Sequence, residues 1–204
     1  FNQFGDMDVR AEILIEPSVL EKVINLENEI IRLYKNDECI YPFSERMGEV
    51  YGELFERVRD KLYSMPFTSD LLQEYVFSRE NNWVDNEAIV RGMYSAALLK
   101  LFCEKKTGQE IKIDGRGKTW NYLFHFVFEA KNIRIQNISG NNILAYAGSC
   151  ENGRVENVTL CNMKGNDILR NAGSDGGNIK NIALYDIRGN SLCSEMGSYD
   201  GNVS

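Results

Sequence analysis

The residues best suited to chemistry in this chain are one histidine and three charged residues on successive copies of a repeated unit. His125 is the only histidine. With the copies aligned, Arg170 takes the position of His125, Asp167 lies three residues before Arg170, and Glu195 lies one position later in the following copy. Imidazole and carboxylate groups transfer protons, and a guanidinium neutralises an acidic sugar or an oxyanion. We therefore treat His125, Asp167, Arg170 and Glu195 as candidate catalytic or sugar-binding residues. The alternative is that they are unrelated polar residues on a solvated face.

A glycine-rich segment, Gly115–Thr119, is the second candidate site. A phosphate-binding loop of the Walker type needs a glycine five positions before Gly117, and Lys112 stands there. A helix should also follow such a loop, whereas an aromatic run follows this segment. We therefore predict a glycine-rich corner, and binding of a small anion at this corner stays an alternative.

Neither a metal site nor a cofactor is expected. The chain has one histidine, and Asp175 is a single acidic residue in a glycine-rich turn rather than part of a calcium loop. The five cysteines are odd in number and irregularly spaced, so they indicate neither a disulfide framework nor paired metal ligands. They are Cys39, Cys103, Cys150, Cys161 and Cys193. A reducing cytoplasm fits this pattern best.

The elements that must position the candidate residues belong to a repeat in the last third of the chain. Two dipeptides recur at intervals of 25 and then 24 residues: Gly-Asn at 140, 165 and 189, and Gly-Ser at 148, 173 and 197. A fixed period of this length is typical of solenoids, whose units stack to bury an apolar face that none can bury alone.

Each unit is predicted to consist of short strands joined by tight corners. Apolar residues alternate at Ile133 and Ile135, and the spacing changes to three at Ile138, just before Gly-Asn. Glycines suit corners that need positive φ, and stacked asparagine amides can bond along a column. The predicted columns are Asn132, Asn157 and Asn181, and Asn141, Asn166 and Asn190. These features together indicate a parallel β-helix.

Two phrases, IDGRG at 113–117 and KNIRIQNIS at 131–139, resemble right-handed parallel β-helix proteins of the pectate lyase and polygalacturonase type. The resemblance covers about residues 111–203, and what it implies is the fold. The paired aspartates, GHG and RIK patterns of the pectinolytic enzymes have no counterpart in this chain. The resemblance therefore does not extend to their activity.

Residues 1–108 are predicted to form a helical cap domain. Ser18 and Glu21 make a capping box, and apolar residues recur at helical spacing over 47–62 and 85–102, with a shorter helix near 70–76. A short strand is predicted at 11–16. Residues 1–107 carry the whole net charge of −7, with 20 acidic and 13 basic side chains. The aromatic run at 120–128 is expected to bind this half to the first coil.

The predicted fold is therefore α+β, with a helical cap over 1–108 and a short right-handed parallel β-helix over 109–204. The parallel β-helix should have three to four coils of 24–25 residues, near 111–129, 130–153, 154–177 and 178–201.

The sequence favours a non-catalytic function at the C-terminal coil. No stripe of Lys and Arg indicates nucleic acid, no apolar run is long enough for a membrane span, and no signal peptide is visible. An unpaired coil invites further strand pairing. We therefore expect a cytoplasmic interaction or assembly module that binds a protein partner or a second copy through this coil. A carbohydrate-active or sugar-binding protein is the alternative.

Overall fold

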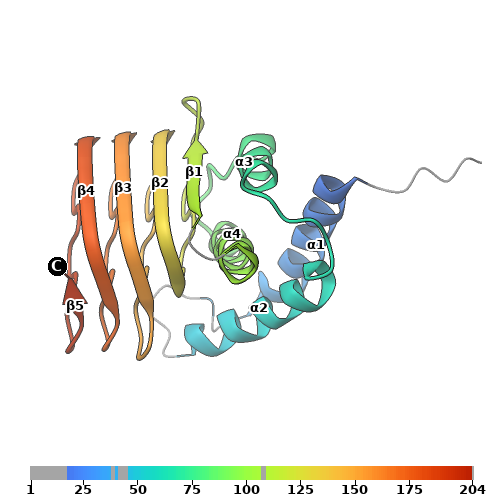
Figure 1. The fold of residues 1–204 in the computed structure, drawn as a ribbon, viewed down its shortest axis with the longest axis horizontal. Coiled ribbons are helices and arrows are strands. Elements are labelled where there is room, and N and C mark those ends of the chain that lie inside the picture. Colours follow the sequence, from blue (N-terminus) through green and yellow to red (C-terminus); the bar gives the residue numbers. More distant parts are fainter. Residues whose placement is uncertain (1–17, 38–39, 41–45, 107–108, 204) are drawn as a thin grey trace, which may run out of the picture.

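The computed structural model describes residues 18–37, 40, 46–106 and 109–203, in which four helices lead into a parallel β-solenoid of about four turns. The helices are α1 (Val19–Tyr34), α2 (Met47–Leu62), α3 (Ser69–Ser78) and α4 (Asn86–Lys105). The strands are β1 (Glu110–Asp114), β2 (Glu129–Ser139), β3 (Arg154–Lys164), β4 (Asn178–Arg188) and β5 (Asn202–Val203). The helices gather beside β1, at one end of the stacked coils (Figure 1). The predicted α+β fold is confirmed, and the strand predicted at 11–16 lies outside the described residues.

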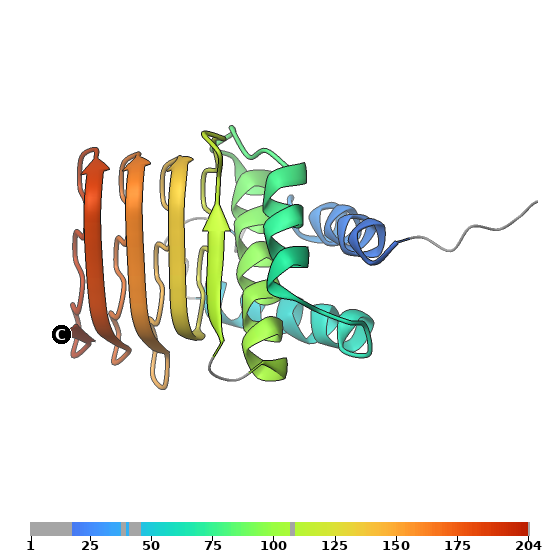
Figure 2. The same cartoon turned by 45° about the horizontal axis from the view of Figure 1, so that its top comes forward.

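Side-chain caps explain where three of the helices begin. The Ser18 hydroxyl accepts the backbone N–H of Glu21, and the Glu21 carboxylate accepts that of Ser18, which confirms the capping box. Thr68 and Asp85 cap α3 and α4 through their own side-chain oxygens. Helix α4 is buried along most of its length and packs between the other helices and the first coils (Figure 2).

One parallel sheet runs through all the coils, in the order β1-β2-β3-β4-β5. Equivalent residues of successive coils pair directly, so that Ile133 lies beside Val158 and Val158 beside Ile182. The side chains of Ile113, Ile135 and Leu160 are buried on the inner face. The register is the one that the repeat predicts.

The apolar spacing of three marks a bulge inside each strand, and the predicted corner follows at Gly-Asn, directly after the strand ends. Strand β2 continues through Ile138 to Ser139, and Asn137 within it has a φ of 55°. Asn162 and Asp186 take the same conformation at the equivalent positions, with φ of 51° and 50°. Asn and Asp tolerate the left-handed region better than other side chains. The extra residue is therefore accommodated without ending the strand.

A second pair of apolar residues follows the strand of each coil, as at Ile143-Leu144 and Ile168-Leu169. It lies in an irregular wall made of turns, near 141–152 and 166–176. Residues with positive φ recur along this wall, as at Leu144 (55°) and Leu169 (59°), and the backbone amides of these two residues donate to carbonyls of the preceding coil. Successive side chains of a strand point to opposite faces, whereas Ile143 and Leu144 are both fully buried. The irregular backbone lets both members of the pair enter the core.

The glycines of the Gly-Asn pairs allow neighbouring coils to approach closely. A Cβ on Gly165 would overlap the carbonyl group of Gly140, and a Cβ on Gly189 would overlap that of Gly165. Gly165 does not have a positive φ, so the requirement at this position is space rather than conformation. The Gly-Ser glycines at 148, 173 and 197 do have positive φ, of 60°, 65° and 63°, as predicted.

Both predicted asparagine columns are hydrogen-bonded. Asn157 donates its side-chain N–H to Asn132 Oδ1, and Asn181 donates to Asn157 Oδ1, each at 2.7 Å. In the second column the side-chain oxygen accepts a backbone N–H of the next coil, as Asn141 Oδ1 does from Asn166 at 2.9 Å. The two columns therefore join successive coils along the axis of the solenoid.

A third column occupies the bulge positions. Asn137 donates its side-chain N–H to the carboxylate of Asp114 (3.1 Å), and Asn162 donates to Asn137 Oδ1 (2.8 Å). The next position is Asp186, whose carboxylate pairs with Arg188 instead (3.2 Å). A carboxylate cannot donate to Asn162 Oδ1, so the column is interrupted at the last coil.

Polar groups of the helical half take the place of a coil before β1. Gln73 of α3 donates its side-chain amide to the carbonyl of Asp114 (3.0 Å) and accepts the backbone N–H of Asp114 (2.6 Å). Asn81 forms an isolated parallel bridge with Trp120. The Asn81 carbonyl accepts the backbone N–H of Asn121 at 2.7 Å. These contacts satisfy part of the edge that the first coil would otherwise expose.

Replacing Gly165 with Ala should destabilise the fold by about 1–3 kcal/mol, because the new Cβ would overlap the Gly140 carbonyl and force the coils apart. Chemical denaturation measures the change. The neighbouring exposed Lys164, replaced with Ala, is the matched control and should stay within about 0.5 kcal/mol of the parent. Equal tolerance of both substitutions would contradict the close approach of the coils.

Replacing Asp186 with Asn should stabilise the fold by about 0.5–1.5 kcal/mol, because the new amide can donate to Asn162 Oδ1 and complete the third column. The exposed ion pair with Arg188 that is lost contributes little. Chemical denaturation of the parent and of Asp186→Asn checks this outcome. The variant should have the higher denaturation midpoint and the same m-value. Asn162→Asp is the reverse change and should destabilise, and a stability gain in this second variant would disprove the column.

Candidate functional site

The three charged candidate residues meet on the irregular wall of the solenoid. The guanidinium of Arg170 lies 3.8 Å from a carboxylate oxygen of Asp167 and 3.7 Å from one of Glu195. All three side chains are partly exposed, so water weakens both ion pairs. The structure therefore brings Asp167, Arg170 and Glu195 together into one solvated cluster.

His125 is buried and makes no ion pair with this cluster. Its ring lies edge-on to the rings of Tyr122 and Tyr146, with centroids 5.3 and 5.6 Å away. Neither ring nitrogen has a hydrogen-bond partner among the described residues. Burial lowers the pKa of His125 to about 3, so the ring is neutral near pH 7. A general acid or base must reach its substrate, and this geometry gives His125 the position of a core aromatic residue instead.

A groove of about 590 Å³ lies between the start of α2 and the wall. The rings of Phe126 and Tyr146 stack within it, with centroids 5.1 Å apart and an interplanar angle of 18°. Burial raises the pKa of Tyr146, and a hydrogen bond with Asn171 opposes part of this rise. Glu195 contributes to the rim. Stacked aromatic rings beside a few polar groups are a common arrangement in ligand sites.

Sequence reasoning did not select Phe126, Tyr146 and Asn171, although the repeat contained the signal. Tyr146 and Asn171 occupy the same aligned position as Glu195 in earlier copies, and Phe126 precedes them in the first coil. The column becomes a groove only because Met47 and Gly48 of α2 lie against it. That contact between distant segments is not visible in the repeat.

The Gly115–Thr119 corner does not offer its backbone amides to an anion. The N–H groups of Gly115 and Gly117 donate to carbonyls of β2, at 2.8 and 2.7 Å, and that of Lys118 donates to Gly115. The N–H of Arg116 donates to the Asp114 carboxylate at 2.9 Å. Phosphate-binding loops depend on several unpaired N–H groups directed at one point, and these four are already used.

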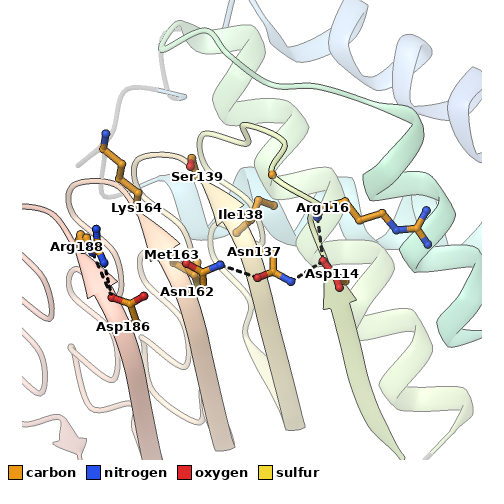
Figure 3. A pocket seen from close by; sticks show the side chains of 11 residues that line it. Asp114, Arg116, Asn137, Ile138, Ser139, Asn162, Met163, Lys164, Asp186 and Arg188 are labelled. Carbon is orange, nitrogen blue, oxygen red and sulfur yellow. Dashed lines mark hydrogen bonds and ion pairs between the residues drawn. The ribbon is translucent and has the colours of Figure 1, made fainter.

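A hollow of about 550 Å³ beside this corner follows the ends of β1 to β4 (Figure 3). Asp114, Asn137 and Asn162 bond to one another along it. The cationic groups do not converge: Arg116 lies over the ring of Phe77, 4.6 Å from its centroid, and Arg188 pairs with Asp186. The hollow is therefore the surface of the third column, with its polar groups mostly satisfied inside the protein.

The last coil exposes apolar side chains that are buried in every earlier coil. Leu160 of β3 is fully buried, whereas Leu184, its direct neighbour in β4, is 39% exposed. Ile182 and Ile187 are likewise less covered than their neighbours in β3. Strand β5 pairs with β4 only at Asn178 and Ile179. Within the described residues, the rest of the outer edge of β4 has no neighbouring strand.

The described ranges were compared with the requirements of a metal site and of a membrane-spanning helix. No three side chains of His, Cys, Asp or Glu in these ranges are grouped so that they could hold a metal ion. None of the four helices combines the length and the apolar character needed to cross a bilayer. Comparison of the chain with models of protein families, with curated proteins and with solved structures finds no match.

The buried histidine should make the fold sensitive to acid. Because its pKa is about 3 in the folded state and about 6.5 in the unfolded state, stability is lost as the pH falls from 6.5 towards 3. The loss from His125 is about 1.4 kcal/mol per pH unit once the pH is well below 6.5. Denaturation of the parent and of His125→Phe between pH 7 and 4 isolates this contribution. Parallel pH profiles for the two proteins would contradict a neutral buried ring.

Proposed function

We propose that this chain is a non-catalytic assembly module that binds a coil of another polypeptide at its open C-terminal end. The proposal is based on the outer edge of β4, which exposes both apolar side chains and backbone groups. Leu184 of β4 is 39% exposed, whereas Leu160, its neighbour in the preceding coil, is fully buried. Unpaired strand edges and exposed apolar surface both favour association.

The contrast between the two ends of the solenoid supports this function. Ile111 and Ile113 of β1 are buried, because the helices and Gln73 cover the first coil. The described helices provide no such cover at β4, on the far side of the sheet (Figure 1). Natural sheet proteins usually protect exposed edges with charge, bulges or covering elements, so one protected end and one open end suggest a binding surface.

The cytoplasm is the compartment that we propose for this module. The cysteines of the described part, at positions 103, 150, 161 and 193, are free thiols. Burial raises the pKa of Cys103 to about 11, and burial also raises the pKa values of Cys150 and Cys193. Protonated thiols react slowly, which suits structural cysteines in a reducing compartment.

A sugar-binding function is the second candidate, and the groove beside α2 favours it. The stacked rings of Phe126 and Tyr146 offer a flat apolar surface, and Arg170 and Glu195 offer charged hydrogen-bonding groups nearby. This alternative does not use His125 as a proton donor. A small-anion site at Gly115–Thr119, the third alternative, has the weakest support because its amides are already bonded.

A peptide that copies one internal coil tests the assembly function. We choose residues 156–175 with Cys161→Ser, labelled for fluorescence anisotropy. This segment is the internal equivalent of a coil that would pair with the outer edge of β4 in the same register. The peptide should bind the parent chain. Leu184→Lys should weaken binding at least tenfold, because a charge would enter the apolar contact. Ser64→Lys, the same charge on the exposed surface of the helical half, should have no effect.

Two results would overturn the proposal. One is the absence of peptide binding to the correctly folded parent chain. The other is equal binding to the parent and to Leu184→Lys. Specific binding in a glycan screen that Arg170→Ala abolishes, together with a chain that stays monomeric in light scattering, would instead favour the sugar-binding alternative.

A further inference from the structure

The groove between the start of α2 and the irregular wall is built from two columns of the repeat. The residues of one column take equivalent positions in three successive coils, and those of the other directly follow the Gly-Ser pairs. The columns are Tyr146, Asn171 and Glu195, and Cys150, Asp175 and Tyr199. None of the residues that line the groove belongs to β4. The groove is therefore a surface of the wall and is separate from the outer edge of β4.

Aromatic and sulfur-containing side chains make one part of the groove apolar. Phe126 and Tyr146 stack with their ring centroids 5.1 Å apart. Met47 and Cys150 lie beside them, and Tyr199, which is 80% exposed, adds a third ring. A flat apolar group that packs against such rings removes both surfaces from water. This part of the groove therefore suits the apolar part of a ligand.

The charged groups of the groove are acidic. Among the described residues that line it, only Asp175 and Glu195 carry a charge. Glu195 shares the guanidinium of Arg170 with Asp167, at 3.7 and 3.8 Å, so one guanidinium serves two carboxylates. Asp175 accepts a hydrogen bond from the Ser174 hydroxyl at 2.8 Å and forms no ion pair with another described residue. The groove therefore has negative charge without a matching cation.

The positive groups at the start of α2 do not offset this charge. Met47 and Gly48 line the groove, and the helix dipole places the equivalent of about half a positive charge at this end of α2. Arg46, the residue before the helix, pairs with the carboxylate of Glu49 at 3.2 Å. Half a charge is less than that of the two carboxylates on the rim. The groove as a whole therefore favours a cation over an anion.

We infer that the groove binds a small organic cation, a protonated amine that carries a flat apolar group. The apolar group packs against Phe126 and Tyr146, and the ammonium group lies towards Asp175 and Glu195. Asp175 is one coil and Glu195 two coils beyond Tyr146, about 5 and 10 Å along the solenoid axis. An arylethylamine laid along this axis has its ring beside Tyr146 and its nitrogen between the two carboxylates. Aromatic faces also attract cations.

This inference goes beyond the assembly function, because the groove and the outer edge of β4 share no residue. It also differs from sugar binding in what it asks of the acidic rim. A neutral sugar would use the rings but leave Asp175 and Glu195 without a counter-charge, whereas an ammonium group satisfies both the rings and the carboxylates.

Tryptamine and tryptophol are matched probes, because they share the indole ring and its two-carbon chain and differ in an ammonium against a hydroxyl group. NMR titration of the full chain should show that tryptamine binds about tenfold more tightly than tryptophol. Asp175→Asn with Glu195→Gln should remove this preference and leave the affinity for tryptophol unchanged. Glu129→Gln with Glu156→Gln, two charges of the strands outside the groove, is the control and should change neither affinity.

Tyr146→Asn tests the aromatic part of the site. Asn171 takes the same position in the next coil, and Asn tolerates the φ of 59° at position 146, so this variant should fold. It removes a ring and no charge, and it should therefore weaken both probes by a similar factor. Circular dichroism checks that the fold is kept.

Four results would overturn the inference. Tryptamine could fail to bind at millimolar concentration, or bind the parent no better than tryptophol, or bind the Asp175 and Glu195 double variant as well as the parent. Tighter binding of neutral methyl glucoside than of tryptamine would instead assign the groove to a sugar. Retained binding of the coil peptide in any of these cases would leave the assembly function unaffected.

Discussion

The structure depends on the pairing of each coil with its neighbours. A coil of about 24 residues has unpaired backbone groups on both edges and an apolar interior open on both sides, so it is stable only between two other layers. The internal coils meet this condition through strand pairing, three polar columns and glycines that permit close approach. The first end of the stack, at β1, is a place where the condition must be met differently.

At the first end, residues of the helical half take the place of the missing neighbouring coil and bond to the free edge. The amide of Gln73 makes the same pair of hydrogen bonds with Asp114 that a neighbouring strand would make. The backbone of Asn81 bonds to Thr119 and Asn121, the residues on either side of Trp120. The Trp120 indole donates to the carbonyls of Val76 and Arg79, which ties the end of α3 to the first coil. The cap is thus joined to the solenoid by directed polar contacts as well as by apolar packing.

Much of this architecture could be predicted from the sequence because identical backbone environments recur every 24 or 25 residues. The Gly-Asn pairs, two asparagine columns and the register of the sheet were all visible in the repeat. The bulge at Asn137 was not, because a change from alternation to a spacing of three fits either a corner or a bulge in a continuous strand. The burial of His125 and the groove at Tyr146 depend on contacts with α4 and α2, which local patterns do not contain.

The carboxylate of Asp114 has a consequence for how the solenoid forms. Because it can only accept, it sets the orientation of the two amides above it in the third column, Asn137 and Asn162, and each amide defines the acceptor for the next. The stack therefore has a beginning, where the cap holds Asp114 through Gln73, and a direction of growth away from it. Folding that starts at the cap can advance one coil at a time with each new layer templated by the last, whereas a coil that formed first at the far end would have no fixed polarity to copy.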